Sequence, residues 1–155
     1  MRLKDAADDF LRCRRIAVTG VSRHPDRHGS NVVYRRLRAR GYEVFAVNPN
    51  ADSVEGDVCF PSIASIDGGV DAVVIGTAPG RAEATVRECV ELGIGKVWMH
   101  RSMGQGSVSG PAAVIGRSHG ISVIAGGCPL MFEPAADAGH KLIRGCLALA
   151  HRLPA

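Results

Sequence analysis

The chain alternates between short, almost wholly apolar runs and longer stretches in which apolar and polar residues are mixed. Five short runs stand out, at residues 16–19, 44–47, 72–75, 96–99 and 122–125. Runs that are apolar at nearly every position are typical of parallel strands covered on both faces of a sheet. Gly20, Gly76 and the Asn48-Pro49 pair end the first three runs, as expected where a strand passes into a loop.

The mixed stretches have the spacing and the end signals of helices. Residues 31–40 follow Ser30, a candidate N-cap, and precede Gly41, a suitable residue for ending a helix. Further helices are predicted at residues 1–14, 81–92, 111–119 and 135–151. The alternation predicts an α/β protein with a three-layer, Rossmann-like, doubly wound parallel sheet of about five strands.

Residues 1–155 are expected to form a single domain, because no linker or low-complexity segment interrupts the alternation. The least regular segment, 50–70, is expected to be a crossover with a short strand near Cys59 and Phe60. The last helix has a leucine-rich face, which could support a homodimer. Three of its leucines are expected to pack onto the sheet: Leu142, Leu147 and Leu149.

The loops that follow the strands are the candidate site, because open parallel sheets bind ligands beyond the carboxyl ends of their strands. After the first strand, a glycine allows a tight turn, and the next helix opens with amides that favour an anion. The candidate contacts here are Gly20, Val21, Ser22, Arg23, Ser30 and Asn31, with added charge from Arg27 and His28. The loop suits a phosphate or diphosphate, and a solvated basic loop is the alternative.

The loops after the second and third strands narrow the class of nucleotide. A site for NAD usually carries Asp or Glu at the end of the second strand. Here that strand ends in Val47, Asn48 and Pro49, which favours a ligand with an extra phosphate near the ribose, coenzyme A or NADP. After the third strand, Thr77 is a candidate donor to a phosphate and Pro79 a flat apolar wall. The alternative for Asn48 and Pro49 is that they only form a turn, and the alternative for Thr77 and Pro79 is that they only begin a helix.

These loops resemble the CoA-binding domain family, which includes small bacterial proteins and the N-terminal domain of the succinyl-CoA synthetase α subunit. The similar segments lie within residues 15–129, at 18–22, 30–33, 41–44, 47–49, 60–62, 70–71 and 96–99, with Pro25, Gly56 and Pro79 between them. The resemblance implies binding of coenzyme A or acyl-CoA through its ADP end. The phosphates would lie on the loop after the first strand, and adenine near the loops after the second and third.

The resemblance also bears on single side chains. Cys128 lies in a Cys-Pro segment similar to that of the family and is a candidate contact for the pantetheine arm; a buried packing residue is the alternative. Synthetase relatives carry a lysine soon after the second strand that is absent here, so Arg23 or Arg27 is expected to replace it. The synthetase phosphohistidine belongs to a second domain, so His140 receives no catalytic role, whereas His100 is a candidate contact.

Composition limits the remaining classes of function. The net charge of +4 suits an anionic ligand, and the few aromatic residues are not interleaved with basic ones, so no nucleic acid is expected. Five scattered cysteines without a CxxC pair argue against disulfides and structural zinc. No apolar run has the length of a membrane span or the core of a signal peptide, so a cytoplasmic protein without a membrane partner is expected.

No set of nucleophile, base and orienting acid can be assembled from the sequence, and neither GxSxG nor HExxH occurs. Non-catalytic binding of coenzyme A is therefore the expected function. Two alternatives stay open: an NADP-dependent reductase, and a structural or partner-binding Rossmann domain without a ligand.

Overall fold

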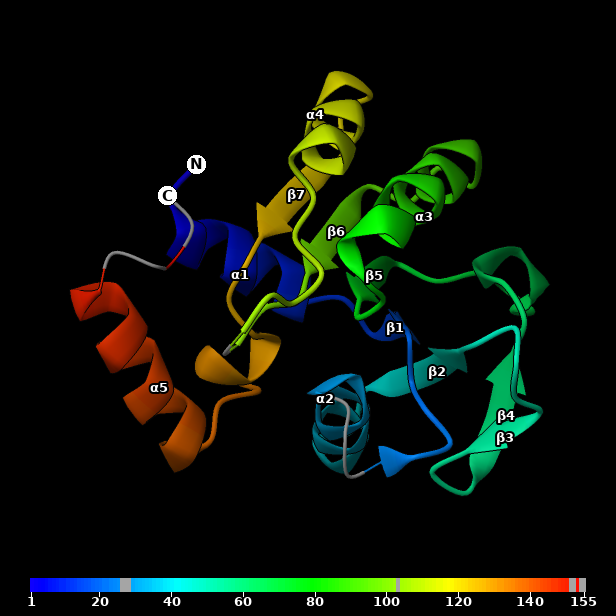
Figure 1. Ribbon diagram of the computed structural model, residues 1–155, viewed down its shortest axis with the longest axis horizontal. Helices are drawn as coiled ribbons and strands as arrows, with labels where there is room; N and C mark the ends of the chain where they lie inside the picture. The colour runs from blue at the N-terminus through cyan, green and yellow to red at the C-terminus, as the bar shows by residue number, and fades with distance from the viewer. Residues whose placement is uncertain (26–28, 103, 151–152, 154–155) are drawn as a thin grey trace.

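The computed structural model describes residues 1–25, 29–102, 104–150 and 153 of the chain. Its centre is a 7-stranded sheet with the order β3-β4-β2-β1-β5-β6-β7 (Figure 1). The strands are β1 (Arg15–Thr19), β2 (Glu43–Val47), β3 (Ser53–Val54), β4 (Asp57–Phe60), β5 (Ala72–Ile75), β6 (Lys96–Met99) and β7 (Ser122–Ala125). Neighbouring strands pair in parallel except β3, which runs antiparallel to β4.

The parallel strands follow the order of a Rossmann sheet, since β4-β2-β1-β5-β6-β7 corresponds to the order 3-2-1-4-5-6 of dinucleotide-binding folds. The α/β, Rossmann-like prediction is confirmed, and the predicted strands are all present. The short strand expected near Cys59 and Phe60 is β4, while β3 was not expected. Strand order reverses between β1 and β5, so the switch point lies at their carboxyl ends.

Helices cover both faces of the sheet. The helices are α1 (Leu3–Leu11), α2 (Gly29–Ala39), α3 (Pro79–Glu91), α4 (Gly110–Ser118) and α5 (Ala138–Leu149). Alternate residues of β1 point to opposite faces: Ile16 and Val18 pack with α1 and α2, whereas Ala17 packs with α3 and α4. Figure 1 shows α3 and α4 side by side and α5 at the periphery. Among the described residues, no helix is long and apolar enough to cross a membrane.

Two details of the sequence-based prediction are wrong. Ser30 is not the N-cap of α2, because the helix begins at Gly29 and the Ser30 hydroxyl is bonded to a distant loop instead. Leu142 and Leu149 do not pack onto the sheet and are 72% and 85% exposed. The reason is that α5 lies against the 3-10 turn η3 (Pro129–Met131), so only the face with Leu147 reaches the core.

Candidate functional site

The loops after β1 and β5 touch at the switch point. Gly20, directly after β1, has a φ of +76°, and a Cβ there would lie 2.7 Å from the backbone oxygen of Gly76. The Ser30 hydroxyl donates to that same oxygen at 3.1 Å. A Cβ at Gly76 would lie 2.1 Å from the Ser30 Oγ. This approach of two loops and the first turn of α2 is possible only with glycine at both positions.

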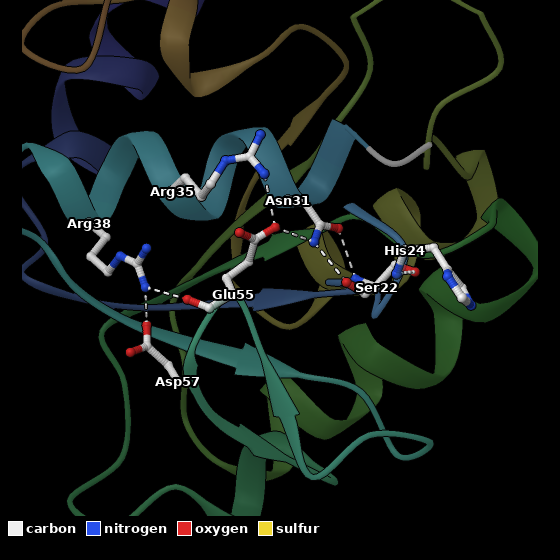
Figure 2. Close-up of polar contacts among 7 residues, drawn as sticks. All are labelled: Ser22, His24, Asn31, Arg35, Arg38, Glu55 and Asp57. Carbon is white, nitrogen blue, oxygen red and sulfur yellow. Dashed lines mark hydrogen bonds and ion pairs between the residues drawn. The ribbon is translucent and has the colours of Figure 1, made fainter. Parts of the chain in front are cut away.

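Asn31 holds the first part of the loop after β1, around Ser22, in place. It is fully buried, and its Oδ1 accepts the Ser22 N–H while its Nδ2 donates to the Ser22 carbonyl oxygen, each at 2.8 Å (Figure 2). The Ser22 Oγ accepts the N–H of His24 at 3.0 Å. The side chains of Ser30 and Asn31 are thus occupied within the protein, whereas the Ser22 hydroxyl only accepts and can still donate. The N–H groups of Ser22 and His24 are engaged as well, so the backbone donors left to a ligand are those of Val21, Arg23 and the first turn of α2 within the described residues.

Glu55 supports Asn31 from the other side and was missed by the sequence analysis. Its carboxylate accepts the Asn31 Nδ2 at 2.7 Å and pairs with Arg35 at 3.0 Å, and its side chain is only 10% exposed. Glu55 has a φ of 53° in the turn between β3 and β4. The signal in the sequence was the Glu-Gly pair within the irregular segment 50–70, which marks the turn of a short hairpin.

A second set of contacts ties this hairpin to α2. Arg38 pairs with Asp57 and donates to the Glu55 carbonyl oxygen at 3.0 Å (Figure 2). The Tyr34 hydroxyl donates to the Asp57 carboxylate at 2.7 Å. That hydrogen bond, reinforced by Arg38, lowers the pKa of Asp57, so the carboxylate stays ionised and the hairpin stays attached to the helix.

The loop after β2 lies against the loop after β1. The N–H of Gly20 donates to the Val47 oxygen at 3.0 Å, and the Asn48 Nδ2 donates to the Val21 oxygen at 2.9 Å. The Asn48 Oδ1 accepts the backbone N–H two residues on at 2.9 Å, which closes a turn. Pro49 is exposed at the rim. The structure therefore brings together the predicted residues of the first two loops.

Thr77 supplies the observation that points to a ligand. Its Oγ1 is buried and, within the described part of the chain, has no hydrogen-bond partner. Leaving a buried hydroxyl unpaired costs about 1–3 kcal/mol, so a ligand group or a water that pairs with it would bind favourably. Thr77 directly follows Gly76, beside the loop after β1 and the first turn of α2, and the half-buried Pro79 opens α3.

Positive charge is available at the same place. Arg23 is exposed on the loop after β1, whereas Arg27 and His28 lie outside the described residues. The first N–H groups of α2, from Gly29 onward, have no partner within the helix and form its positive end. The switch point thus combines free backbone donors, an unpaired hydroxyl and a guanidinium, which together suit the phosphates of a nucleotide.

Two further candidates lie deeper at the same edge of the sheet. The ring of His100 lies against the start of α2, since a Cβ at Gly29 would be 3.0 Å from its Cε1. Burial, and secondly the charge of His140, lower the pKa of His100 to about 4, so the ring is neutral at pH 7. Cys128 is 1% exposed, and burial raises its pKa to about 12. Its thiol is therefore protonated and packed in the core, and contact with pantetheine stays a prediction.

The sequence matches the profile of the CoA binding domain family over residues 14–134. It is 33% identical over 88 residues to the ADP-forming acetate–CoA ligase II of Archaeoglobus fulgidus, covering 56% of this chain and 13% of that protein. It is 32% identical over 92 residues to protein YneT of Bacillus subtilis, covering 59% of this chain and 67% of that protein. The chain therefore spans only a small part of the ligase that it matches.

Solved structures agree with this result. A protein from Pyrococcus horikoshii superposes with a TM-score of 0.75 at 25% identity, over 84% of this chain and 88% of that one. A protein from Thermus thermophilus superposes with a TM-score of 0.71 at 23% identity, which shows the shared fold. The resemblance drawn from the sequence is confirmed: the chain belongs to the CoA binding domain family.

Proposed function

We propose that this chain binds coenzyme A or an acyl-CoA through its ADP end, at the edge of the sheet where β1 and β5 diverge. The observation that supports this most strongly is the buried, unpaired hydroxyl of Thr77 beside the glycine contact of the two loops. Membership of the CoA binding domain family supplies the class of ligand.

In this proposal the diphosphate lies on the N–H groups of the first turn of α2 and on those of Val21 and Arg23, because the N–H groups of Gly20, Ser22 and His24 have partners in the protein. The Thr77 hydroxyl is a further donor. Arg23 takes the place of the lysine found in synthetase relatives and contacts a phosphate. Adenine is bordered by the loop from Val47 to Pro49 and by Pro79. The thiol that carries the acyl group belongs to the ligand, and the protein binds and orients that ligand.

We propose a binding role without catalysis, because most polar side chains around the site, the Thr77 hydroxyl excepted, already have structural partners. Asn31, Ser30 and Asn48 are each bonded to the backbone of neighbouring loops. His100 and Cys128 are both neutral at pH 7 and buried, so neither provides an activated base or nucleophile.

The state of the cysteines indicates the cellular compartment in which the protein acts. All five are free, at positions 13, 59, 89, 128 and 146, and the first four are buried. Unpaired thiols are the rule where glutathione and thioredoxin keep proteins reduced. We propose that residues 1–155 act there, in the cytoplasm, as one binding unit.

The test is a calorimetric titration with CoA, dephospho-CoA, NADP and NAD, together with the shift in melting temperature. A ligand at 100 times its Kd stabilises the folded state by about 2.7 kcal/mol, which is easily measured. We expect CoA to bind best and dephospho-CoA, which lacks the 3′-phosphate, at least about tenfold more weakly. Tighter binding of NADP than of CoA would favour the reductase, and binding of none of the four would favour a domain without a ligand.

A matched pair of variants tests the observation behind the proposal. Thr77→Val removes the unpaired hydroxyl, so we expect CoA affinity to fall about tenfold while the ligand-free protein becomes no less stable. Thr85→Val, on α3, removes a hydroxyl that donates to the Arg81 oxygen, and it should leave CoA affinity unchanged. Equal effects of both substitutions on affinity would contradict the role given to Thr77.

A further inference from the structure

A second concave site lies at the opposite edge of the sheet, where β1 and β2 begin. A hollow of about 320 Å³ opens there between the end of α1, the turn from α2 into β2, and Pro134. Arg14 and Gly20 flank β1 on opposite sides, and a five-residue strand is about 17 Å long. The hollow is therefore separate from the switch-point site.

Three arginines, Arg12, Arg14 and Arg40, are among the residues that line this hollow, and within the described part of the chain no acidic residue does. Arg12 and Arg14 are exposed, and their side chains make no ion pair or hydrogen bond within the described part of the chain. The Nη2 of Arg40 donates to the Ala136 oxygen at 2.9 Å, which holds that guanidinium in place.

Three carboxylates lie next to residues that line the hollow, and each has a partner within the protein. Asp71 accepts the backbone N–H groups of Arg14 and Arg15 at 3.1 and 2.9 Å. Glu43 pairs with Arg15 at 2.8 Å, and Glu133 pairs with Lys141. The Asp71 carboxylate therefore lies beside the Arg14 backbone, but the guanidinium groups of Arg12 and Arg14 form no ion pair within the described residues and can pair with a bound anion.

The walls of the hollow add a second feature. The Tyr42 hydroxyl donates to the Leu11 oxygen at 2.8 Å, so the ring is fixed in position. Tyr42 and Pro134 present flat apolar surfaces beside the arginines. A fork of guanidinium donors next to a flat apolar wall is suited to a phosphate group with an organic part attached.

We propose that this hollow is a second ligand site, for a small organic phosphate or diphosphate. Two or three guanidinium groups match an anion of at least two charges, which a phosphate provides in compact form. None of the residues that line the hollow belongs to the switch-point site.

The experiment uses the full chain saturated with CoA and pyrophosphate as the probe, followed by calorimetry and by the amide shifts of Gly41 and Tyr42. Arg12→Gln/Arg14→Gln is expected to weaken pyrophosphate binding at least tenfold and to leave the melting temperature unchanged. Arg2→Gln/Lys4→Gln removes the same charge from exposed positions on the other end of α1, with side chains 91% and 75% exposed, and is expected to change binding less than twofold.

Three outcomes would overturn the proposal: no pyrophosphate binding with CoA present, equal weakening by both double variants, or binding of polyglutamate but not of pyrophosphate. The last would indicate an acidic protein segment as the partner. If CoA does not bind, pyrophosphate binding that depends on Arg12 and Arg14 would still support this site, so the two proposals fail separately.

Discussion

Asn31 hydrogen-bonds to both backbone polar groups of Ser22, through its Oδ1 and its Nδ2, each at 2.8 Å. Ser22 belongs to the loop after β1 and Asn31 to the first turn of α2, so one buried side chain closes the loop onto the helix. The Asn31 side-chain amide pairs with the N–H and carbonyl of Ser22 in the way that the backbone of a neighbouring strand would. The segment from Gly20 to His24 therefore has its shape before a ligand arrives, and binding need not supply the cost of ordering it.

Asn31→Ala should destabilise the protein by about 2–3 kcal/mol, because it leaves the backbone N–H and carbonyl of Ser22 without their partner and removes one of the two donors to Glu55. Urea unfolding measures this change. Asn50→Ala is the matched control, since Asn50 is exposed and only its backbone N–H is bonded. A loss below about 0.5 kcal/mol for Asn31→Ala would mean that the loop does not depend on this side chain.

Gly76→Ala should destabilise the fold by about 3 kcal/mol or more, because the new Cβ would lie 2.6 Å from the Thr19 backbone oxygen. Thermal unfolding and expression level report the effect. Gly80→Ala, at the start of α3, has no atom within 4 Å of the new Cβ and should be neutral or slightly stabilising. Equal melting temperatures for the two variants would show that the loops do not approach as described.

His100 makes stability depend on pH. Its pKa is lowered from 6.5 to about 4 in the folded protein, mainly by burial. Above pH 6.5 the ring is neutral in both states; as the pH falls toward 4, the unfolded chain binds a proton that the folded chain does not. The free energy of unfolding should therefore fall by up to about 3 kcal/mol over this range.

Urea unfolding at several pH values tests this dependence. His100→Gln should remove the part of the slope between pH 6.5 and 4, whereas His119→Gln, at an exposed position, should retain it. The same slope in His100→Gln and in the unchanged protein would assign the dependence to other groups.

The cysteines should react in an order set by burial. Cys146 is exposed on α5, whereas Cys89 and Cys128 are buried and their pKa values are raised to about 12. With a maleimide at pH 7, mass spectrometry of the native protein should show rapid modification of Cys146 and slow modification of the other two. Rapid labelling of Cys128 would indicate an accessible thiolate and would support the predicted contact with the pantetheine arm.

The strands and the switch point could be predicted because they depend on local patterns. A buried parallel strand is apolar at every position, and its end is marked by Gly or Asn-Pro within the same few residues. The sequence predicted that the loops after the strands lie at one edge of the sheet. The strand order seen in the structure shows that the loops at Gly20 and Thr77 meet there.

The roles of Ser30, Asn31 and Glu55 could not be predicted, because their partners are distant in the sequence. Ser30 looks like an N-cap in its local context, but its hydroxyl is bonded to Gly76. The short hairpin that carries Glu55 has strands of two and four residues, too short for an alternating pattern to show. Helical spacing likewise shows that Leu142 and Leu149 form a face but not whether another element covers it.

The most direct test of the account is hydrogen–deuterium exchange of the protein with and without saturating CoA. If CoA binds at the switch point, exchange should slow in peptides covering residues 20–25, 29–33 and 76–80, with little change in 120–125 at the far strand of the sheet. Protection confined to other segments, or no protection anywhere, would contradict binding of CoA at the switch point.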